Sequence, residues 1–180
     1  VPTEKLHTVG NPVRAAISAV PPLQYREPRP LNLLVVGGSL GAQILNEIVP
    51  EAVKGLSHLA IRHQCGKGNQ ATVKGLYQQW DVNAEVSDFI DDMADAYTWV
   101  PLPHAVDDHQ TKNAQSLVKH NAAVMIGQSV LKQNLGQAIR QWTTHPLDCI
   151  KTGELARERA NTHATEEVVS HCKAVVGEGD

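Results

Sequence analysis

The sequence predicts an α/β fold built on a parallel, doubly wound sheet. Short apolar runs bounded by glycine alternate with longer segments in which apolar residues recur at helical spacing. Repeated strand–helix units of this kind are typical of parallel sheets covered by helices. The chain has 180 residues, of which 42% are hydrophobic and 19% charged, which is enough for one ordinary domain with a sizeable core.

The individual elements follow from these patterns in chain order. The first strand, 31–36, is a purely apolar run apart from Asn32, which is typical of a strand buried on both faces. Pro50 should kink or restart the helix that follows this strand. The remaining expectations are a helix over 42–56, a strand over 59–65, a helix over about 69–80, a strand over 84–90, a helix over 93–99, a helix over 108–121, a strand over 122–126, a helix over 131–142, and one or two helices over 153–176.

Composition divides the chain into three parts. Five of the ten prolines lie in 20–30, so this segment is expected to be an extended connector. We therefore expect a connector and the start of the domain over 1–30, a ligand-binding α/β domain over 31–150, and C-terminal helices over 151–180. The chain does not begin with methionine, so it is expected to be a fragment.

The regular alternation of strands and helices is interrupted after residue 99. A strand should follow the helix over 93–99, but the sequence VPLPH contains two prolines and leads at once into the next helix. A complete βαβ unit needs roughly 30 residues. We therefore expect that a strand, either alone or together with a helix, is missing at the junction of Val100 and Pro101, through a gap or a deletion in the sequence.

Composition also argues against several functions. Aromatic residues make up only 4% of the chain and the formal charge is −3, which argues against a nucleic-acid-binding surface. The three cysteines are far apart and form no C-x-x-C motif, so neither a disulfide framework nor a zinc site is expected, and a reducing cytoplasm fits best. The sequence shows neither a signal peptide nor the ~20 consecutive apolar residues of a membrane span.

A glycine-rich turn joins the first strand to the first helix. Gly37, Gly38 and Gly41 flank Ser39 at a helix N-terminus, where free N–H groups and the helix dipole favour a phosphate. Glycine lets a phosphate approach the backbone, and the serine hydroxyl can donate a further hydrogen bond. The spacing is neither G-x-G-x-x-G nor a P-loop. The alternative, that the turn needs glycine only for its geometry, stays open.

Two further segments offer polar contacts. Arg14, in GNPVR, could form a bidentate contact with phosphate or carboxylate, although a surface ion pair is the commoner role for such a residue. Phe89 and Ile90 are expected at the carboxyl end of a strand, where open α/β sheets bind ligands. Backbone groups there could contact a flat ring. On pattern alone, however, Phe89 is expected in the core and Asp91 or Asp92 at a helix cap.

The segment 103–114, PHAVDDHQTKNA, gathers polar side chains at an expected helix start. His109, Gln110 and Asn113 are three or four residues apart, so they could share a helical face and donate hydrogen bonds to sugar hydroxyls. The H-x₄-H spacing of His104 and His109 does not place both imidazoles on one face. A polar helix cap is therefore favoured over a metal site.

Five segments, in this order, resemble the carboxyl-terminal half of the MurG family. They are GNPVR, VVGGSLGAQILNEIVP, HQCGK, FIDDM and PHAVDDHQTKNA. The members of that family are bacterial undecaprenyldiphospho-muramoylpentapeptide β-N-acetylglucosaminyltransferases, which act in peptidoglycan synthesis. The resemblance covers nearly the whole chain and implies a hexosyltransferase of the GT-B type, whose second Rossmann-like domain this chain would form.

The resemblance also implies a substrate and its contacts. The donor UDP-N-acetylglucosamine would bind with its diphosphate on Ser39 and the neighbouring amides, its uracil on the backbone of Ile90, and its sugar on Gln110 with Asn113 nearby. Arg14 would also contact the nucleotide-sugar. The implied binding residues are Arg14, Gly38, Ser39, Ile90, Gln110 and Asn113, with supporting positions at Gly37, Gly41, Phe89 and His109.

The resemblance implies no cofactor and no metal, and it leaves the catalytic residue unassigned. The general base and the acceptor site would belong to the amino-terminal domain. The residues of this chain alone should therefore not catalyse the transfer. The family's A-L-T-x-x-E motif has no counterpart here and would fall at the Val100–Pro101 junction. The acceptor would be lipid-linked muramoyl-pentapeptide, reached at the inner face of the bacterial cell membrane.

Two other functions remain open. A nicotinamide-dependent oxidoreductase domain would require G-x-G-x-x-G and an acidic residue at the end of the second strand, whereas that strand is expected to end in His63-Gln64-Cys65. A noncatalytic α/β module would use its polar helix caps only for structure.

Overall fold

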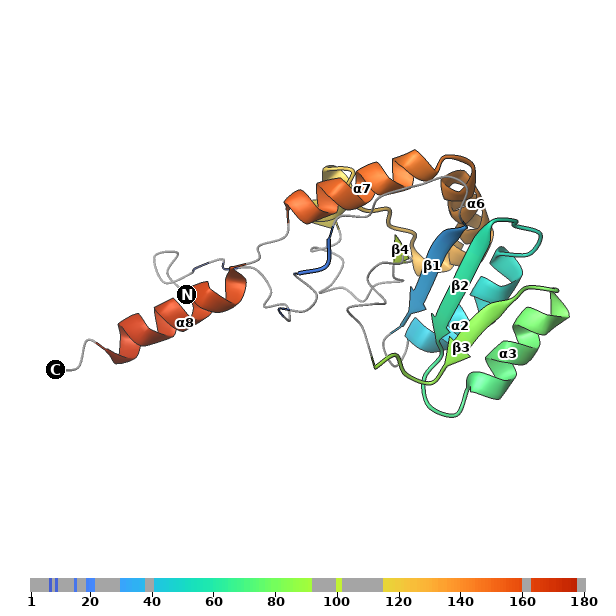
Figure 1. The fold of residues 1–180 in the computed structure, drawn as a ribbon, viewed down its shortest axis with the longest axis horizontal. Coiled ribbons are helices and arrows are strands. Elements are labelled where there is room, and N and C mark those ends of the chain that lie inside the picture. The colour runs from blue at the N-terminus through green and yellow to red at the C-terminus, as the bar shows by residue number, and fades with distance from the viewer. Residues whose placement is uncertain are drawn as a thin grey trace.

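The computed structural model describes residues 7, 9, 15, 19–21, 30–37, 41–91, 100–101, 115–159 and 163–177. Its central unit is a sheet with helices packed against it (Figure 1). The elements are β1 (Leu31–Val36), α2 (Gly41–Ala52), β2 (Leu59–Gln64), α3 (Gln70–Gln79), β3 (Ala84–Ser87), β4 (Val100–Pro101), the 3₁₀ turn η2 (Gln128–Val130), α6 (Leu131–Thr144), α7 (Pro146–Glu158) and α8 (Ala164–Val176).

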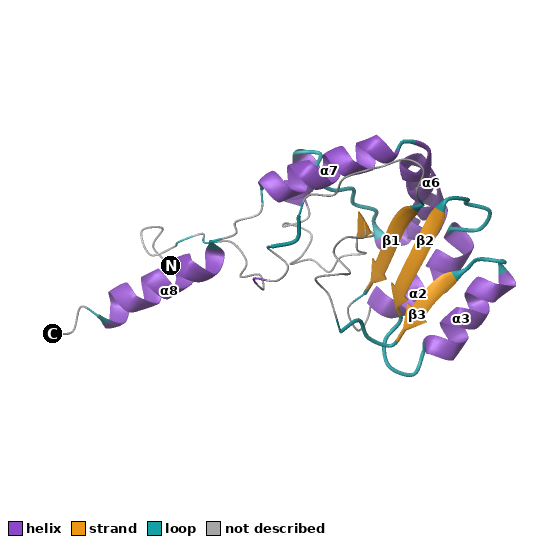
Figure 2. Cartoon of the chain, viewed as in Figure 1, coloured by secondary structure: helices purple, strands orange, loops and turns teal. Residues whose placement is uncertain are grey.

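The four strands form one parallel sheet in the order β3-β2-β1-β4. The chain steps outward from β1 through β2 to β3 and then returns to the other side of β1 to form β4. The direction of winding therefore reverses between β1 and β4, and open α/β sheets bind ligands at such a reversal, beyond the carboxyl ends of the strands. In Figure 2 the arrowheads of β1, β2 and β3 point to one edge of the sheet, which is the edge where a ligand is expected.

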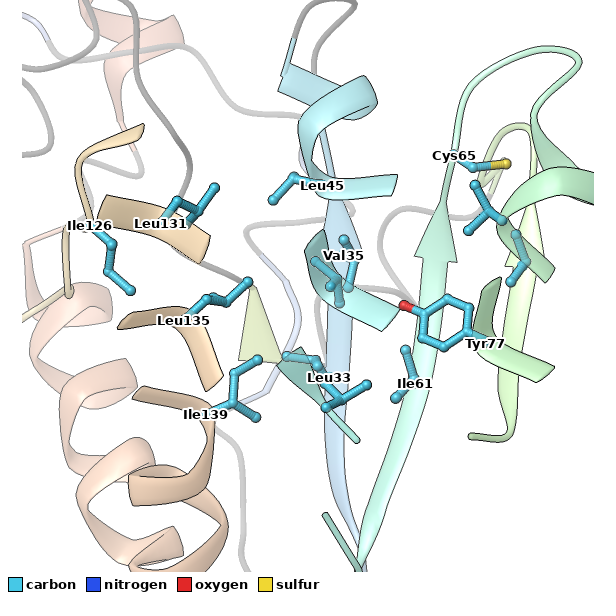
Figure 3. Packing of buried hydrophobic residues seen from close by; sticks show 14 residues of the cluster. Leu33, Val35, Leu45, Ile61, Cys65, Tyr77, Ile126, Leu131, Leu135 and Ile139 are labelled. Atoms are coloured by element: carbon cyan, nitrogen blue, oxygen red, sulfur yellow. The ribbon is translucent and has the colours of Figure 1, made fainter. Parts of the chain in front are cut away.

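The core lies between the sheet and helices α2, α3 and α6. Leu33 and Val35 of β1 face Leu131, Leu135 and Ile139 of α6, which recur every four residues along one helical face (Figure 3). Helix α6 also packs against α2. Gly136 allows this close contact, because a Cβ there would lie 3.0 Å from the carbonyl oxygen of Ala52, which is tighter than an ordinary contact.

Local pattern predicted most of these elements correctly. The first strand has the expected bounds, 31–36, and the helix expected over about 69–80 is α3. The helix expected over 42–56 is shorter, because α2 ends at Ala52, two residues after Pro50. A turn with Gly55 at φ 68° follows. Proline removes one hydrogen bond of the last turn, so the helix ends soon after it rather than restarting.

The expected strand over 122–126 is wrong: these residues have no strand conformation, although Ala122 and Ile126 are buried. A strand needs hydrogen-bonding partners along its length, and within the described part of the chain β4, at that edge of the sheet, offers two residues, Val100 and Pro101. Among the described residues a strand, β4, is present at the junction where we expected its loss, and it pairs with β1 through Leu33 with Val100 and Leu34 with Pro101.

The C-terminal part contains two helices, one of the two alternatives that the sequence left open. Helix α7 begins at Pro146, earlier than the expected residue 153, because proline is well suited to the first position of a helix. The expected helix over 93–99 lies outside the described residues, as do 108–114 of the next one, whose described residues 115–119 are helical. Within the described part of the chain, no helix is long and apolar enough to cross a bilayer.

Candidate functional site

The candidate site lies at the carboxyl ends of β1 and β2. Strand β1 ends at Val36, Gly37 follows, and α2 begins at Gly41, so the glycine-rich segment connects a strand to a helix N-terminus as expected. Residues 38–40, with Gly38 and Ser39, lie outside the described residues. The first turn of an α-helix leaves backbone N–H groups without helical partners, and the positive end of the helix dipole lies there.

A buried asparagine ties α2 to the neighbouring strand. The Asn46 side-chain Nδ2 donates to the carbonyl oxygen of Cys65, directly after β2, at 2.9 Å. Asn69, just before α3, donates to the same oxygen at 3.1 Å. One carbonyl thus joins the middle of α2 and the residue before α3 to the end of β2.

Replacing Asn46 with alanine should lower the free energy of unfolding by about 1–2 kcal/mol, because a buried hydrogen bond is lost and a small void is created. Urea denaturation measures the change. Asn83→Ala, at an exposed position before β3, is the matched control and should change stability by less than about 0.5 kcal/mol. Equal effects of the two substitutions would show that the Asn46–Cys65 bond does not stabilise the site.

The turn after β2 is held by Asp88. Gly66 and Gly68 have φ of 81° and 82°, a left-handed conformation that favours glycine. The Gly68 N–H donates to Asp88 Oδ2 at 3.2 Å. The thiol of Cys65 donates to the carbonyl of Ser87 at 3.2 Å, and burial, with the charge of Asp88, raises its pKa. This cysteine is therefore a protonated structural group rather than a nucleophile.

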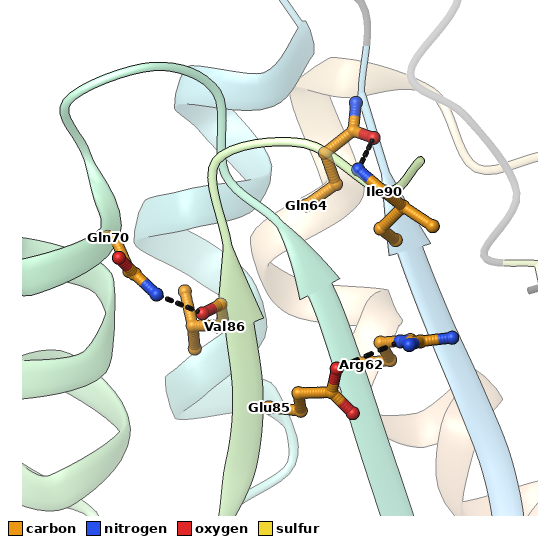
Figure 4. Close-up of polar contacts among 6 residues, drawn as sticks. All are labelled: Arg62, Gln64, Gln70, Glu85, Val86 and Ile90. Atoms are coloured by element: carbon orange, nitrogen blue, oxygen red, sulfur yellow. Dashed lines mark hydrogen bonds and ion pairs between the residues drawn. The ribbon is translucent and has the colours of Figure 1, made fainter. Parts of the chain in front are cut away.

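Ile90 lies where the chain leaves β3, and its backbone is held by β2. The Ile90 N–H donates to the side-chain Oε1 of Gln64 at 3.1 Å (Figure 4). Gln64 is the last residue of β2 and pairs with Val36, directly before Gly37. The Gln64–Ile90 contact thus brings Ile90 to the level of the glycine-rich segment.

The expectation that Phe89 belongs to the core is wrong. Its side chain is 61% exposed. In β3 Val86 is buried and Glu85 is exposed, and the alternation puts residue 89 in register with Glu85. The residue therefore offers an exposed aromatic ring next to Ile90, at the edge of the sheet where a ligand is expected.

The structure describes four of the ten site residues expected from the sequence, namely Gly37, Gly41, Phe89 and Ile90, and places them all at the carboxyl edge of the sheet. Arg14, Gly38, Ser39, His109, Gln110 and Asn113 lie outside the described residues. Among the described residues, no group of three or more His, Cys, Asp or Glu side chains could hold a metal ion. The sequence analysis gave no role to Gln64, although it lies in the HQCGK segment and ends a predicted strand.

Comparison with known proteins assigns the family. A model of the glycosyltransferase family 28 C-terminal domain matches residues 32–100 and 98–170. The chain belongs to glycosyltransferase family 28. It is therefore a family 28 domain, and the Rossmann-like C-terminal domain of a GT-B glycosyltransferase is confirmed as its fold.

Individual relatives support the narrower resemblance to the MurG family. The chain is 42% identical over 204 residues to the UDP-N-acetylglucosamine–N-acetylmuramyl-(pentapeptide) pyrophosphoryl-undecaprenol N-acetylglucosamine transferase of Tolumonas auensis, covering 97% of this chain and 58% of the relative. The Aeromonas hydrophila transferase of the same name is 42% identical over 200 residues, covering 96% and 55%. The crystal structure of Acinetobacter baumannii MurG superposes with a TM-score of 0.71 at 35% identity, covering 82% of this chain and 53% of that one.

The same matches show how much of each relative the chain covers and how they align around Val100–Pro101. The chain spans about half the length of the relatives that it matches. The alignment with the Tolumonas auensis protein covers 204 residues, more than the 180 of this chain, so the relative carries residues without a counterpart here. The two segments matched by the family model overlap at 98–100, next to the junction at which the sequence predicted a missing segment.

Proposed function

We propose that this family 28 domain binds UDP-N-acetylglucosamine as the donor half of an enzyme that transfers N-acetylglucosamine to lipid-linked N-acetylmuramoyl-pentapeptide. One structural observation carries the proposal: the glycine-rich segment leads from the carboxyl end of β1 into the N-terminus of α2, beside the point where the winding reverses. The names of the relatives supply the substrate class.

The glycine-rich segment would bind the diphosphate. In this proposal Ser39 donates its hydroxyl, the amides around Gly38 donate their N–H groups, and Arg14 adds a positive charge. The uracil lies against the backbone of Ile90, and Gln110 and Asn113 hold the sugar hydroxyls. Gly37, Gly41, Phe89 and His109 support these contacts.

The reaction would be a single inverting displacement. A hydroxyl of the acceptor attacks the anomeric carbon, the bond from that carbon to the diphosphate breaks, and UDP leaves with the bonding electrons. Negative charge grows on the leaving diphosphate, so N–H groups positioned around it stabilise the transition state more than the ground state. A general base on the other half of the enzyme would take the proton of the acceptor hydroxyl.

The same proposal covers partners and location. The acceptor is lipid-linked, so the complete enzyme would work at the inner face of the bacterial cell membrane. The acceptor site and the base are expected in the other half, so we expect the 180 residues alone to bind the donor without turning it over.

Isothermal titration calorimetry tests the proposal directly. UDP and UDP-N-acetylglucosamine should bind, and NAD should not. Binding of NAD instead would favour the nicotinamide-dependent domain, against which the absence of an acidic residue at the end of β2, His63-Gln64, argues. Binding of none of the three would favour a noncatalytic module.

Ser39→Ala and Arg14→Ala should each weaken UDP binding by about tenfold, because each removes one hydrogen bond to a charged group. The matched controls are Ser57→Ala, in the exposed turn before β2, and Arg140→Ala, on the exposed face of α6. Both controls should leave the dissociation constant unchanged. Unaltered UDP affinity in both Ser39→Ala and Arg14→Ala would contradict the assignment of the phosphate site.

A further inference from the structure

Two buried polar atoms have no hydrogen-bond partner within the described part of the chain. They are the side-chain oxygen Oδ1 of Asn46, on α2, and the ring nitrogen Nε2 of His63, on β2. Asn46 is 7% exposed and His63 is 0% exposed. Buried polar groups are nearly always paired, with protein or with an ordered water molecule, because an unpaired group loses its hydration without compensation.

Both side chains lie on the face of the sheet that α2 and α3 cover. His63 alternates along β2 with Ile61 and Cys65, which belong to the core between the sheet and these helices. Asn46 reaches β2 from the helix side, because its Nδ2 donates to the carbonyl oxygen of Cys65 at 2.9 Å. Cys65 follows His63 by two residues, about 7 Å along the strand. A molecule that makes two hydrogen bonds joins atoms about 5 to 6 Å apart, a separation of the same order.

The partners of each side chain determine what its unpaired atom offers. His63 Nδ1 lies 2.9 Å from the hydroxyl of Tyr77, which points from α3 into the core (Figure 3). A neutral imidazole nitrogen is a stronger acceptor than a phenol oxygen, so the Tyr77 hydroxyl donates to Nδ1 and the ring proton is on Nε2. The Asn46 amide is oriented by its bond to Cys65, which leaves Oδ1 as an acceptor. One unused donor and one unused acceptor thus lie in the same layer of the core.

We propose that one buried water molecule joins His63 Nε2 to Asn46 Oδ1. The water accepts the His63 Nε2–H and donates to Asn46 Oδ1, so both unpaired atoms are satisfied. Water is the smallest molecule that can both accept and donate, and two protein ligands are too few for a metal site. The water is enclosed by the core, so it does not give the imidazole the hydration of bulk solvent.

The water completes a chain of polar contacts through three elements. The chain runs from Tyr77 on α3 through His63 on β2 to Asn46 in the middle of α2, and from there to the carbonyl of Cys65, which Asn69 also contacts. His63 and Asn46 are therefore positioning residues that fix α2 against β2. The site does not depend on which ligand the glycine-rich segment binds.

NMR of the whole chain with ¹⁵N-labelled histidine tests the site without any substitution. At neutral pH the two ring nitrogens of His63 should report the Nε2–H tautomer, and the Nε2–H proton should show cross-relaxation with a bound water. His63→Gln identifies the signals that belong to this ring. Tyr77→Phe removes the donor to Nδ1, so the preference for the Nε2–H tautomer should weaken.

Asn46→Asp tests whether the two side chains are within reach of one water. Aspartate keeps an oxygen at this position and adds a negative charge close to the imidazole. His63 should therefore bind its proton about tenfold or more tightly, which is a rise in its pKa. Gln43→Glu is the matched control, because it makes the same change from amide to carboxylate on the exposed side of α2. It should leave the titration of His63 unchanged, and circular dichroism shows whether each variant is folded.

Each measurement can overturn the inference. An Nδ1–H tautomer in the unsubstituted chain, or no water contact at Nε2–H, contradicts the water site, and neither result depends on a variant that folds. Equal titration of His63 in Asn46→Asp and Gln43→Glu would place Asn46 too far from the ring for one water to join them. The Nε2–H tautomer, a bound water at that proton and tighter proton binding in Asn46→Asp alone support the site.

Discussion

Replacing Leu135 with alanine is expected to lower the free energy of unfolding by about 2–5 kcal/mol, the range for a buried leucine whose site cannot collapse. Leu135 is 0% exposed and lies at the centre of the α6 face that packs against the sheet (Figure 3). Its neighbours Leu131 and Ile139 are equally enclosed, so little around the void can relax. Urea denaturation at neutral pH measures the loss.

Leu147 provides the matched control, because the same substitution there deletes the same atoms at a position exposed to water instead of one in the core. Its side chain is 68% exposed, on α7. Leu147→Ala should change the free energy of unfolding by less than about 0.5 kcal/mol. If Leu135→Ala were as mild as Leu147→Ala, α6 would not be part of the core in solution.

The substitution Leu135→Ala should also disturb the candidate site. Gly136 lets α6 approach the carbonyl of Ala52 at the end of α2, and the N-terminus of α2 follows the glycine-rich segment. The ion pair between Lys132 and Glu51 joins the same two helices at 3.6 Å, but it is exposed and contributes little. Core packing therefore holds α2, and with it the proposed phosphate site.

The elements that the sequence predicted well are those specified by local pattern. The apolar run of β1, the helical spacing of apolar residues in α3 and the glycines that follow β1 can each be recognised from neighbouring residues alone. The expected strand over 122–126 shows the limit of such reading. Its apolar pattern is sufficient, but a strand also needs a partner, and β4 offers two residues in the part of the chain that the structure describes.

The candidate site shows the same limit. The glycine-rich segment and Ile90 could be found from their places at strand ends. The Gln64–Ile90 hydrogen bond could not, because it joins residues 26 positions apart through the geometry of the turn after β3. The exposure of Phe89, by contrast, could have been predicted from alternation, which puts residue 89 in register with exposed Glu85 rather than with buried Val86.

Acidification is expected to destabilise the fold through His63. This side chain is 0% exposed, its Nδ1 lies 2.9 Å from the Tyr77 hydroxyl, and its Nε2 is buried without a partner among the described residues. Burial lowers the pKa of His63 from 6.5 to about 4. Burial also raises the pKa of Tyr77, so its hydroxyl stays neutral and offers no charge to stabilise an imidazolium.

The sign of this pH dependence follows from the protonation of His63 in the folded and the unfolded chain. Above pH 6.5 the imidazole is neutral whether the chain is folded or not, so protonation of His63 does not lower the free energy of unfolding there. Between pH 6.5 and about 4 the unfolded chain binds a proton that the folded chain does not, so stability falls as the pH falls. The loss between neutral pH and pH 4.5 should be about 2–3 kcal/mol, at 1.36 kcal/mol for each unit of pKa difference.

Urea denaturation of the chain at several pH values, with and without His63→Gln, isolates this contribution. Carboxylates also titrate near pH 4.5, but they do so in both proteins, so the difference between them belongs to His63. Glutamine does not titrate, so the variant should lose about 2–3 kcal/mol less on acidification. His145→Gln, at an exposed position before α7, should keep the full acid loss. A parallel pH dependence for His63→Gln and the unsubstituted chain would mean that water reaches the imidazole, and that the packing of α3 on β2 is looser than the buried Tyr77 contact implies.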